Sequence, residues 1–275
     1  MYQNKVFDVI IVGASYEGIA LCEYLKEKLP ALKVALVSSN FTNCKPRQTL
    51  DGIEKVEKKV IYSSYNHNLI GLTLEDRSNI FGLNVVIATG SRPIPLDIKS
   101  NSIYYKTAGV KRAIKANQAV VVGNDIKAIN AACWAAKKFK YVYFCSPNFQ
   151  LNASKKDIQK LNEIENIVHL PNSHIIDYKN DKRGNICEVS LDTYDTIRCN
   201  SIIAITDRLP DIPQLHPQMI ELDDDGYIVV NHLGETTRIP KLFAVGACTK
   251  YNSKRNIAVL GRRMISINNW KQEEK

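Results

Sequence analysis

The chain has 275 residues, of which 45% are hydrophobic and 24% are charged, and its formal net charge is +9 at pH 7. This composition is typical of a globular protein and excludes a disordered or fibrous chain, while the length allows a large core and two domains. The apolar runs are short and strand-like, and MYQNKVFDVIIVG at the N-terminus lacks the features of a signal peptide. We therefore expect no transmembrane helix and a cytoplasmic protein.

The 37 Lys and Arg residues are spread along the chain. Their densest clusters are KVEKK, KKFK and GRRM, and none of them carries the signature of basic and aromatic residues that marks a nucleic-acid motif. Most of this charge is expected on solvated surfaces. An anionic ligand in a cleft stays open as an alternative.

Seven cysteines are present, and no two of them form a C-x-x-C pair. An odd number without metal-like spacing argues against a disulfide scaffold and against a zinc site. The histidines show no metal spacing either, so we predict no metal.

The first elements form a βαβ unit. Residues 7–13 are an apolar run that ends in glycine, residues 17–28 carry a helical apolar stripe, and residues 34–40 are a second apolar run. The loop GASYEG joins the first strand to the helix and resembles G-x-G-x-x-G, the loop that holds a dinucleotide pyrophosphate at a helix N-terminus.

In this loop Gly13 and Gly18 are the first and third glycines, and Ser15 replaces the second. Serine is small, and its hydroxyl can donate to a phosphate oxygen, so the replacement is tolerable.

The pattern recurs further along the chain. Residues 119–123 predict a strand, residues 126–138 a helix of small residues, and residues 141–145 another strand. Between the two units, residues 84–95 predict a strand that ends in a Thr-Gly turn, and residues 239–249 predict a last buried strand. The fold class is therefore α/β with two Rossmann-like units.

The order of four segments, GASYEG, IATGSRP, VVVGNDIKA and DDDGYIVVN…ETTRIPKLFAVGAC, resembles the thioredoxin-reductase-like flavoproteins of the pyridine nucleotide–disulfide oxidoreductase family. The resemblance covers nearly the whole chain. It implies two three-layer (ββα/βαβ) nucleotide-binding units, the second inserted into the first. An FAD-binding-type domain would comprise residues 1–103 and 209–275, and an NAD(P)-binding-type domain residues 104–208. Relatives of this kind are commonly homodimers.

The resemblance also implies which residues would contact FAD. They are Gly13, Ala14, Ser15, Gly18, Ser38, Thr89, Gly90, Gly246 and Ala247. Two of them depart from the family pattern: Ser38 stands where an acid binds the adenosine ribose, and Ala247 stands where the family has Asp. Losing a charged hydrogen bond costs roughly 1–3 kcal/mol, so we expect a weakened FAD site.

The second Rossmann loop departs further. Asp125 replaces the middle glycine, where a carboxylate repels pyrophosphate and a Cβ blocks the approach of the backbone. Asp207 replaces the glycine of a G-x-x-P turn, and YVYFCSPN lacks the arginines that clasp a ribose phosphate. We therefore expect a degenerate domain that does not bind NAD(P)H in the ordinary way.

The redox disulfide of the family is missing as well. The segment YYKTAGVKRAIKANQ, where a C-x-x-C would fall, holds no cysteine. Cys44 in FTNCK is the one catalytic candidate, because it is similar to the cysteine of coenzyme A disulfide reductases and NADH peroxidases, and Lys45 and Arg47 would favour its thiolate. A plain loop cysteine is the preferred interpretation, because the segment does not continue Cys-Gly-Leu-Pro.

Two functions stay open at this point. One is a divergent FAD-dependent oxidoreductase that lacks its own redox disulfide and exchanges two electrons through flavin with an unknown partner. The other is an inactive pseudo-oxidoreductase with degenerate cofactor sites, which acts as a binding or assembly module.

Overall fold

The computed structural model describes residues 5–41, 50–66, 68–110, 118–250 and 259–264. The chain divides into two compact units, which we call unit 1 (Met1–Arg92 and Leu209–Lys275) and unit 2 (Pro93–Arg208). Residues 93–103 belong to unit 2 rather than to unit 1. Two hydrogen bonds hold them there, from Ile94 N to the Asp207 carbonyl (2.8 Å) and from Leu96 N to the Tyr105 hydroxyl (2.9 Å).

Unit 1 is built on a seven-stranded sheet. Its parallel part comprises β3 (Ile53–Val56), β2 (Val34–Val37), β1 (Val6–Val12), β6 (Asn79–Ile87) and β17 (Leu242–Ala244). The strands are nearly all buried because helices or loops cover both faces, which is why they read as continuous apolar runs.

The long strand β6 pairs with two different neighbours beyond β1. Residues 79–82 pair antiparallel with β5 (Leu69–Leu74), which in turn pairs with β4 (Val60–Asn66). Residues 85–87 pair parallel with β17. One sheet therefore changes from parallel to antiparallel along β6.

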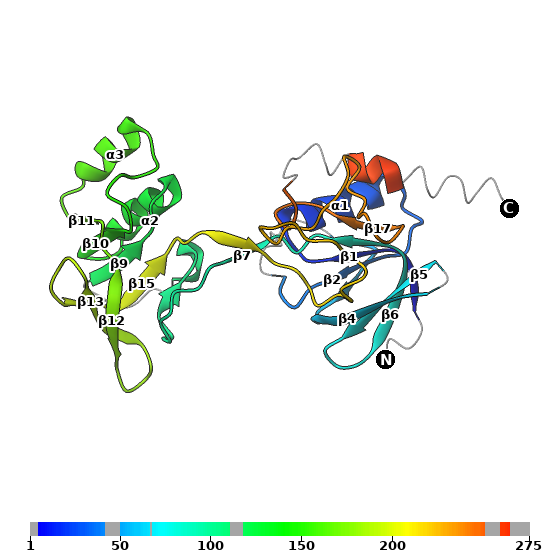
Figure 1. Ribbon diagram of the computed structural model, residues 1–275, viewed down its shortest axis with the longest axis horizontal. Helices are drawn as coiled ribbons and strands as arrows, with labels where there is room; N and C mark the ends of the chain where they lie inside the picture. The colour runs from blue at the N-terminus through cyan, green and yellow to red at the C-terminus, as the bar shows by residue number, and fades with distance from the viewer. Residues whose placement is uncertain (1–4, 42–49, 67, 111–117, 251–258, 265–275) are drawn as a thin grey trace. The chain divides into compact units, whose positions relative to one another are not determined.

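Helix α1 (Tyr16–Lys28) covers one face of this sheet, together with helical residues 259–264 (Figure 1). It buries Gly18, Leu21, Cys22 and Leu25, which recur at i, i+3, i+4 and i+7. The helix ends at Lys28, and its C-cap Leu29 directly precedes Pro30, which cannot continue a helix.

Unit 2 has a parallel sheet of five strands in the order β11-β10-β9-β15-β8. Their bounds are β8 (Ile103–Tyr104), β9 (Gln118–Val122), β10 (Tyr141–Ser146), β11 (Ile167–Pro171) and β15 (Ser201–Ala204). Helices α2 (Ile126–Ala136) and α3 (Lys155–Asn162) pack on one face. The other face carries an antiparallel sheet of β12 (Ile175–Asn180), β13 (Ile186–Leu191) and β14 (Ile197–Arg198).

This three-layer arrangement confirms the predicted α/β class. The chain passes between the units through β7 (Ser91–Pro93) and β16 (Arg208–Pro210), which pair with each other.

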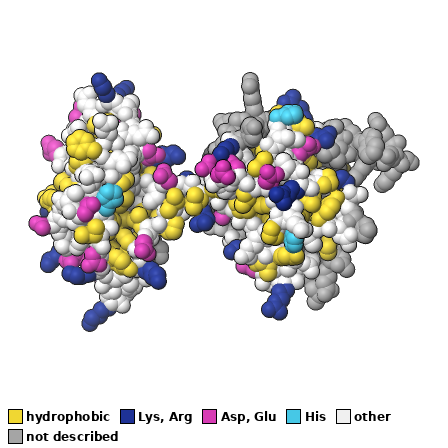
Figure 2. Space-filling view, viewed as in Figure 1, with side chains coloured by type: hydrophobic (Ala, Val, Ile, Leu, Met, Phe, Trp, Pro, Cys, Tyr) yellow, Lys and Arg dark blue, Asp and Glu magenta, His cyan; other side chains and the backbone are white. Residues whose placement is uncertain are grey.

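Within the described ranges, no helix is both long enough and apolar enough to cross a membrane. Figure 2 shows the Lys and Arg side chains scattered over the visible face of each unit rather than gathered in one patch.

Candidate functional site

The residues predicted to contact a cofactor gather at one edge of the sheet of unit 1. Gly13 follows β1, Ser38 follows β2, the pair Thr89–Gly90 follows β6, and the pair Gly246–Ala247 follows β17. These strands are parallel, so their carboxyl ends meet at the same edge. The strand order also reverses at β1, and ligands of open α/β sheets bind at such a point.

Two glycines of the first loop allow backbone segments to touch. Gly13 has a φ of 110°, and a Cβ there would lie 2.5 Å from the Ala88 carbonyl oxygen. A Cβ on Gly18 would lie 2.2 Å from the Gly13 carbonyl oxygen. The loop, the start of α1 and the turn after β6 therefore fit together only without side chains, and Ala14 beside them is buried.

Ser15 is the N-cap of α1. Its Oγ accepts a hydrogen bond from Gly18 N (3.2 Å) and lies 3.1 Å from Glu17 Oε2, to which it donates. We predicted that this hydroxyl can donate to a phosphate; in the structure it donates within its own loop. Ser15 thus closes the helix end with a group of the chain itself.

Glu17 is a site residue that the sequence analysis missed. A Cβ built on Gly246 would lie 2.9 Å from Cδ and 3.0 Å from Oε2 of Glu17, so the half-buried side chain rests on the turn after β17. The signal for it was an acid inside the GASYEG loop, in the first turn of the helix, where the macrodipole favours negative charge.

Other predicted contact residues are engaged in local structure. Ser38 Oγ donates to the Asn40 carbonyl (2.8 Å) and accepts from Asn40 N (3.2 Å), so it builds a turn at the place predicted for ribose. The Thr89 hydroxyl donates to the Asp211 carbonyl, and Asp211 N donates to the Gly90 carbonyl (3.0 Å). These bonds tie the turn after β6 to the segment that follows β16.

Ala247 brings only a methyl group to the edge, and the next residue, Cys248, is buried. The Cys248 thiol donates to the Val245 carbonyl (3.3 Å), and burial raises its pKa to about 11. Such a thiol stays protonated at neutral pH, and Cys248 is therefore a packed core residue. Cys44, the predicted catalytic candidate, lies outside the described residues.

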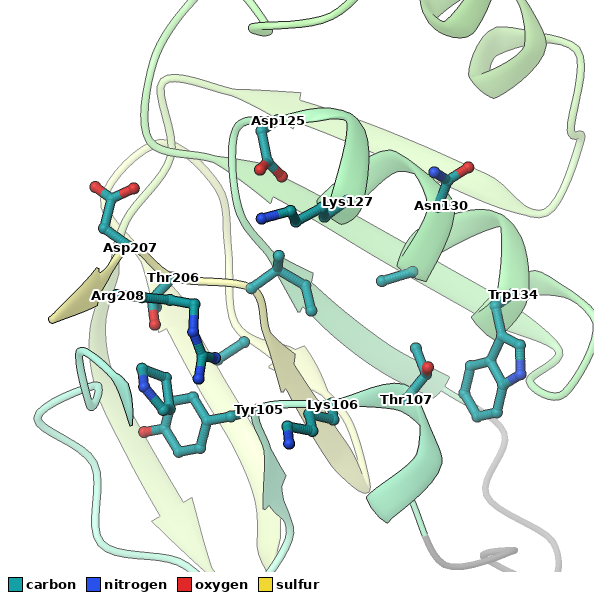
Figure 3. A pocket seen from close by; sticks show the side chains of 14 residues that line it. Tyr105, Lys106, Thr107, Asp125, Lys127, Asn130, Trp134, Thr206, Asp207 and Arg208 are labelled. Carbon is teal, nitrogen blue, oxygen red and sulfur yellow. The ribbon is translucent and has the colours of Figure 1, made fainter. Parts of the chain in front are cut away.

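Unit 2 contains a pocket of about 690 Å³ (Figure 3). It lies at the carboxyl ends of β9 and β15 and runs along α2, whose residues Lys127, Asn130, Ala131 and Trp134 share one helical face. Figure 3 shows Asp125 and Asp207 at one end of the pocket and Trp134 at the other.

The second Rossmann loop keeps its first glycine, but a side chain caps the N-terminus of the helix that follows it. A Cβ on Gly123 would lie 2.5 Å from the Ala128 Cβ and 2.7 Å from the Ile205 carbonyl oxygen, so this close crossing needs glycine. Asp125 is the N-cap of α2, and its Oδ1 accepts from Ala128 N at 2.9 Å. A carboxylate therefore caps the helix end at which a pyrophosphate would bind.

Metal ligation has no support in the described part of the chain, where no group of three or more His, Cys, Asp or Glu side chains is placed to hold an ion.

The sequence model of the pyridine nucleotide-disulphide oxidoreductase family matches residues 7–264. The chain belongs to this family. Comparison with curated proteins finds no match.

Solved structures of several reductases share the fold of this family member. Thioredoxin reductase from T. acidophilum is 17% identical with a TM-score of 0.78, and the match covers 98% of this chain and 100% of that one. Thioredoxin reductase from Lactococcus lactis is 17% identical with a TM-score of 0.77, covering 94% and 98%. The flavoprotein disulfide reductase RclA from Escherichia coli is 14% identical with a TM-score of 0.74, covering 94% and 70%.

The family implies FAD as the cofactor, and the residues of unit 1 decide whether its pyrophosphate fits. The glycine crossings keep the tight turn and the close packing of a dinucleotide-binding loop, but the Glu17 carboxylate lies between the start of α1 and Gly246. Two like charges about 4 Å apart repel by roughly 4 kcal/mol at an effective dielectric constant of about 20. The residues therefore do not fit a pyrophosphate while Glu17 holds this position.

Proposed function

We propose that this family member is a catalytically inactive pseudo-oxidoreductase that acts as a binding module. Unit 1 would be its FAD-binding-type domain, and unit 2 its degenerate NAD(P)-binding-type domain. The observation that carries the proposal is the hydrogen bond from Ala128 N to Asp125, because it places a negative charge at the helix end that would otherwise receive the pyrophosphate of a nicotinamide nucleotide.

The sequence also lacks a dithiol that could pass electrons from flavin to an acceptor. No C-x-x-C occurs anywhere in the chain. Burial raises the pKa of the Cys145 and Cys199 thiols to about 12, which leaves them protonated and unreactive at neutral pH. Neither hydride entry at unit 2 nor dithiol exchange by these cysteines is therefore supported.

The pocket of unit 2 is the ligand site that we assign to this module. Lys106, Lys127 and Arg208 bring positive charge to its lining, and Tyr105 and Trp134 bring aromatic rings. This lining suits a small ligand that has one anionic group and a planar ring. The carboxylates of Asp125 and Asp207 disfavour a second phosphate at the other end.

The test is an anaerobic reaction of the protein with NADPH or NADH, in the presence of excess FAD and an artificial disulfide acceptor. The proposal predicts no nicotinamide oxidation and no flavin bleaching above a control without protein. Protein-dependent bleaching of the flavin would overturn it.

A divergent flavoprotein is the second candidate. It is supported by the intact backbone crossings at Gly13 and Gly18, the first and third glycines of the loop, which in dinucleotide-binding loops give the tight turn and the close packing of helix and strand. In that case FAD would stay with the protein through desalting, and an external donor would reduce it.

A further inference from the structure

We propose that Glu17 is a built-in anion of unit 1. Its carboxylate takes the place that the family gives to the cofactor pyrophosphate, and it holds the first loop, helix α1 and the turn after β17 together without a cofactor. The inference deepens the proposed function, but it rests on other residues, in unit 1 rather than in unit 2.

The position of Glu17 at the start of α1 is the first support. Glu17 is the second residue of α1, after Tyr16, and so lies in the first turn of the helix. The helix macrodipole stabilises an anion there. Ser15 donates to its Oε2 at 3.1 Å and at the same time accepts from Gly18 N. The carboxylate is thus anchored to the cap of its own helix by a charge-assisted hydrogen bond.

The contact with the C-terminal turn is the second support. Gly246 has a φ of 83°, and its backbone meets the Glu17 side chain so closely that a Cβ would lie 2.9–3.0 Å from three of its atoms. The turn itself is closed by a hydrogen bond from Thr249 N to the Gly246 carbonyl (2.9 Å). Glu17 therefore links parts of the chain that are far apart in sequence, as a bound cofactor would.

The space beneath the carboxylate is the third support. The missing Cβ of Gly246 faces the Glu17 side chain, so shortening Glu17 would leave a gap beside the backbone of Gly246. A pyrophosphate would then meet the helix end without a like charge beside it. Glu17 and FAD are therefore mutually exclusive occupants.

The experiment compares wild type, Glu17→Ala, Glu17→Gln and the control Glu23→Ala, which changes an exposed acid of the same helix. Each protein is incubated with FAD and desalted, the retained flavin is measured by absorbance, and the affinity is measured by titrating flavin fluorescence. Thermal unfolding is recorded with and without FAD. Glu17→Gln keeps the shape of the side chain and removes its charge, so it separates repulsion from lack of space.

Wild type and Glu23→Ala should retain no flavin. Glu17→Ala should bind FAD at least about tenfold more tightly, unfold at a lower temperature without FAD and regain stability with it. Glu17→Gln should show a smaller gain in affinity. A Glu17→Ala protein that retains no flavin and unfolds like wild type would overturn the inference, and so would a wild type that binds FAD as tightly as Glu17→Ala.

These failures differ from a failure of the proposed function. Both outcomes that overturn the role of Glu17 leave the argument about unit 2 untouched. If Glu17→Ala gains FAD and NADPH then reduces this flavin, the role of Glu17 is supported and the inactivity of unit 2 is refuted.

Discussion

At the scale of single residues, the glycines of unit 1 are required by the fold whether or not a cofactor binds. The contacts of Gly13 and Gly18 are with backbone atoms, which cannot move aside as the end of a flexible side chain can. Their presence in the sequence therefore does not by itself decide whether FAD binds. The side chains between them, Ser15 and Glu17, decide what the loop can hold.

Gly18→Ala tests this structural role. The new methyl would lie 2.2 Å from the Gly13 carbonyl oxygen, so we expect a loss of about 1–3 kcal/mol in the free energy of unfolding, measured with urea. Gly109→Ala is the matched control, because the nearest atom to its Cβ, in Tyr104, is 3.8 Å away. Equal unfolding midpoints for the two variants would contradict the account.

The buried thiols predict a pH dependence. Burial raises the pKa of Cys145 to about 12 from an ordinary value near 9, so folding favours the protonated thiol. Its contribution is fully present below pH 9 and is lost as the pH rises toward 12. At pH 10 the loss is about 1 kcal/mol. Urea unfolding at pH 8 and pH 10 should therefore show a smaller fall in stability for Cys145→Ala than for wild type; an equal fall would refute the effect.

At the scale of elements, the N-termini of the two Rossmann-type helices are capped in different ways. Helix α1 has a neutral cap, Ser15, with the acid Glu17 in its first turn, whereas helix α2 is capped by the carboxylate of Asp125 itself. Each arrangement satisfies amide groups of the helix end and complements its macrodipole. The helix ends are therefore stable without an external anion.

Substitutions of Asp125 separate its charge from its capping role. Asp125→Asn keeps a good cap without the charge, and Asp125→Gly frees the helix end at a cost of a few tenths of a kcal/mol. We expect NADP⁺ binding to increase in the order wild type, Asn, Gly. The signal is Trp134 fluorescence in a Trp270→Phe background, where Trp134 is the only tryptophan and lines the pocket. Unchanged titrations in all three proteins would contradict the blocking role of Asp125.

The elements that the sequence predicted are those with strong burial patterns. Strands β1, β9 and β10 and helices α1 and α2 were predicted because their apolar residues follow the strand or helix period. Helix α3 was missed because only Leu161 is buried in it, so its sequence carries almost no apolar stripe.

The site could be predicted only in part. The positions of Gly13 and Gly246 follow from motif spacing, because backbone crossings demand glycine. The contact of Glu17 with Gly246 and the bonds of Thr89 with Asp211 join residues far apart in the chain, so no local pattern reports them. The turn between Ser38 and Asn40 depends on a side-chain conformation that sequence does not encode in a recognisable motif.

At the scale of the whole molecule, the family fold persists in both units, and we propose that carboxylates block the places where the cofactors would bind. Unit 1 keeps its sheet and glycine crossings but places Glu17 at the helix end. Unit 2 keeps its sheet and pocket but places Asp125 there. A fold that is stable without cofactors and retains a pocket is what a binding module requires. The homodimer that the family resemblance implies stays a prediction.

The most direct test of this account is the visible absorbance spectrum of the purified wild-type protein after incubation with excess FAD and desalting. We predict a colourless protein, because in our proposal the Glu17 carboxylate takes the place of the pyrophosphate. A protein that retains flavin bands, and whose flavin is bleached by NADPH under anaerobic conditions, would contradict the account and identify the chain as an active oxidoreductase.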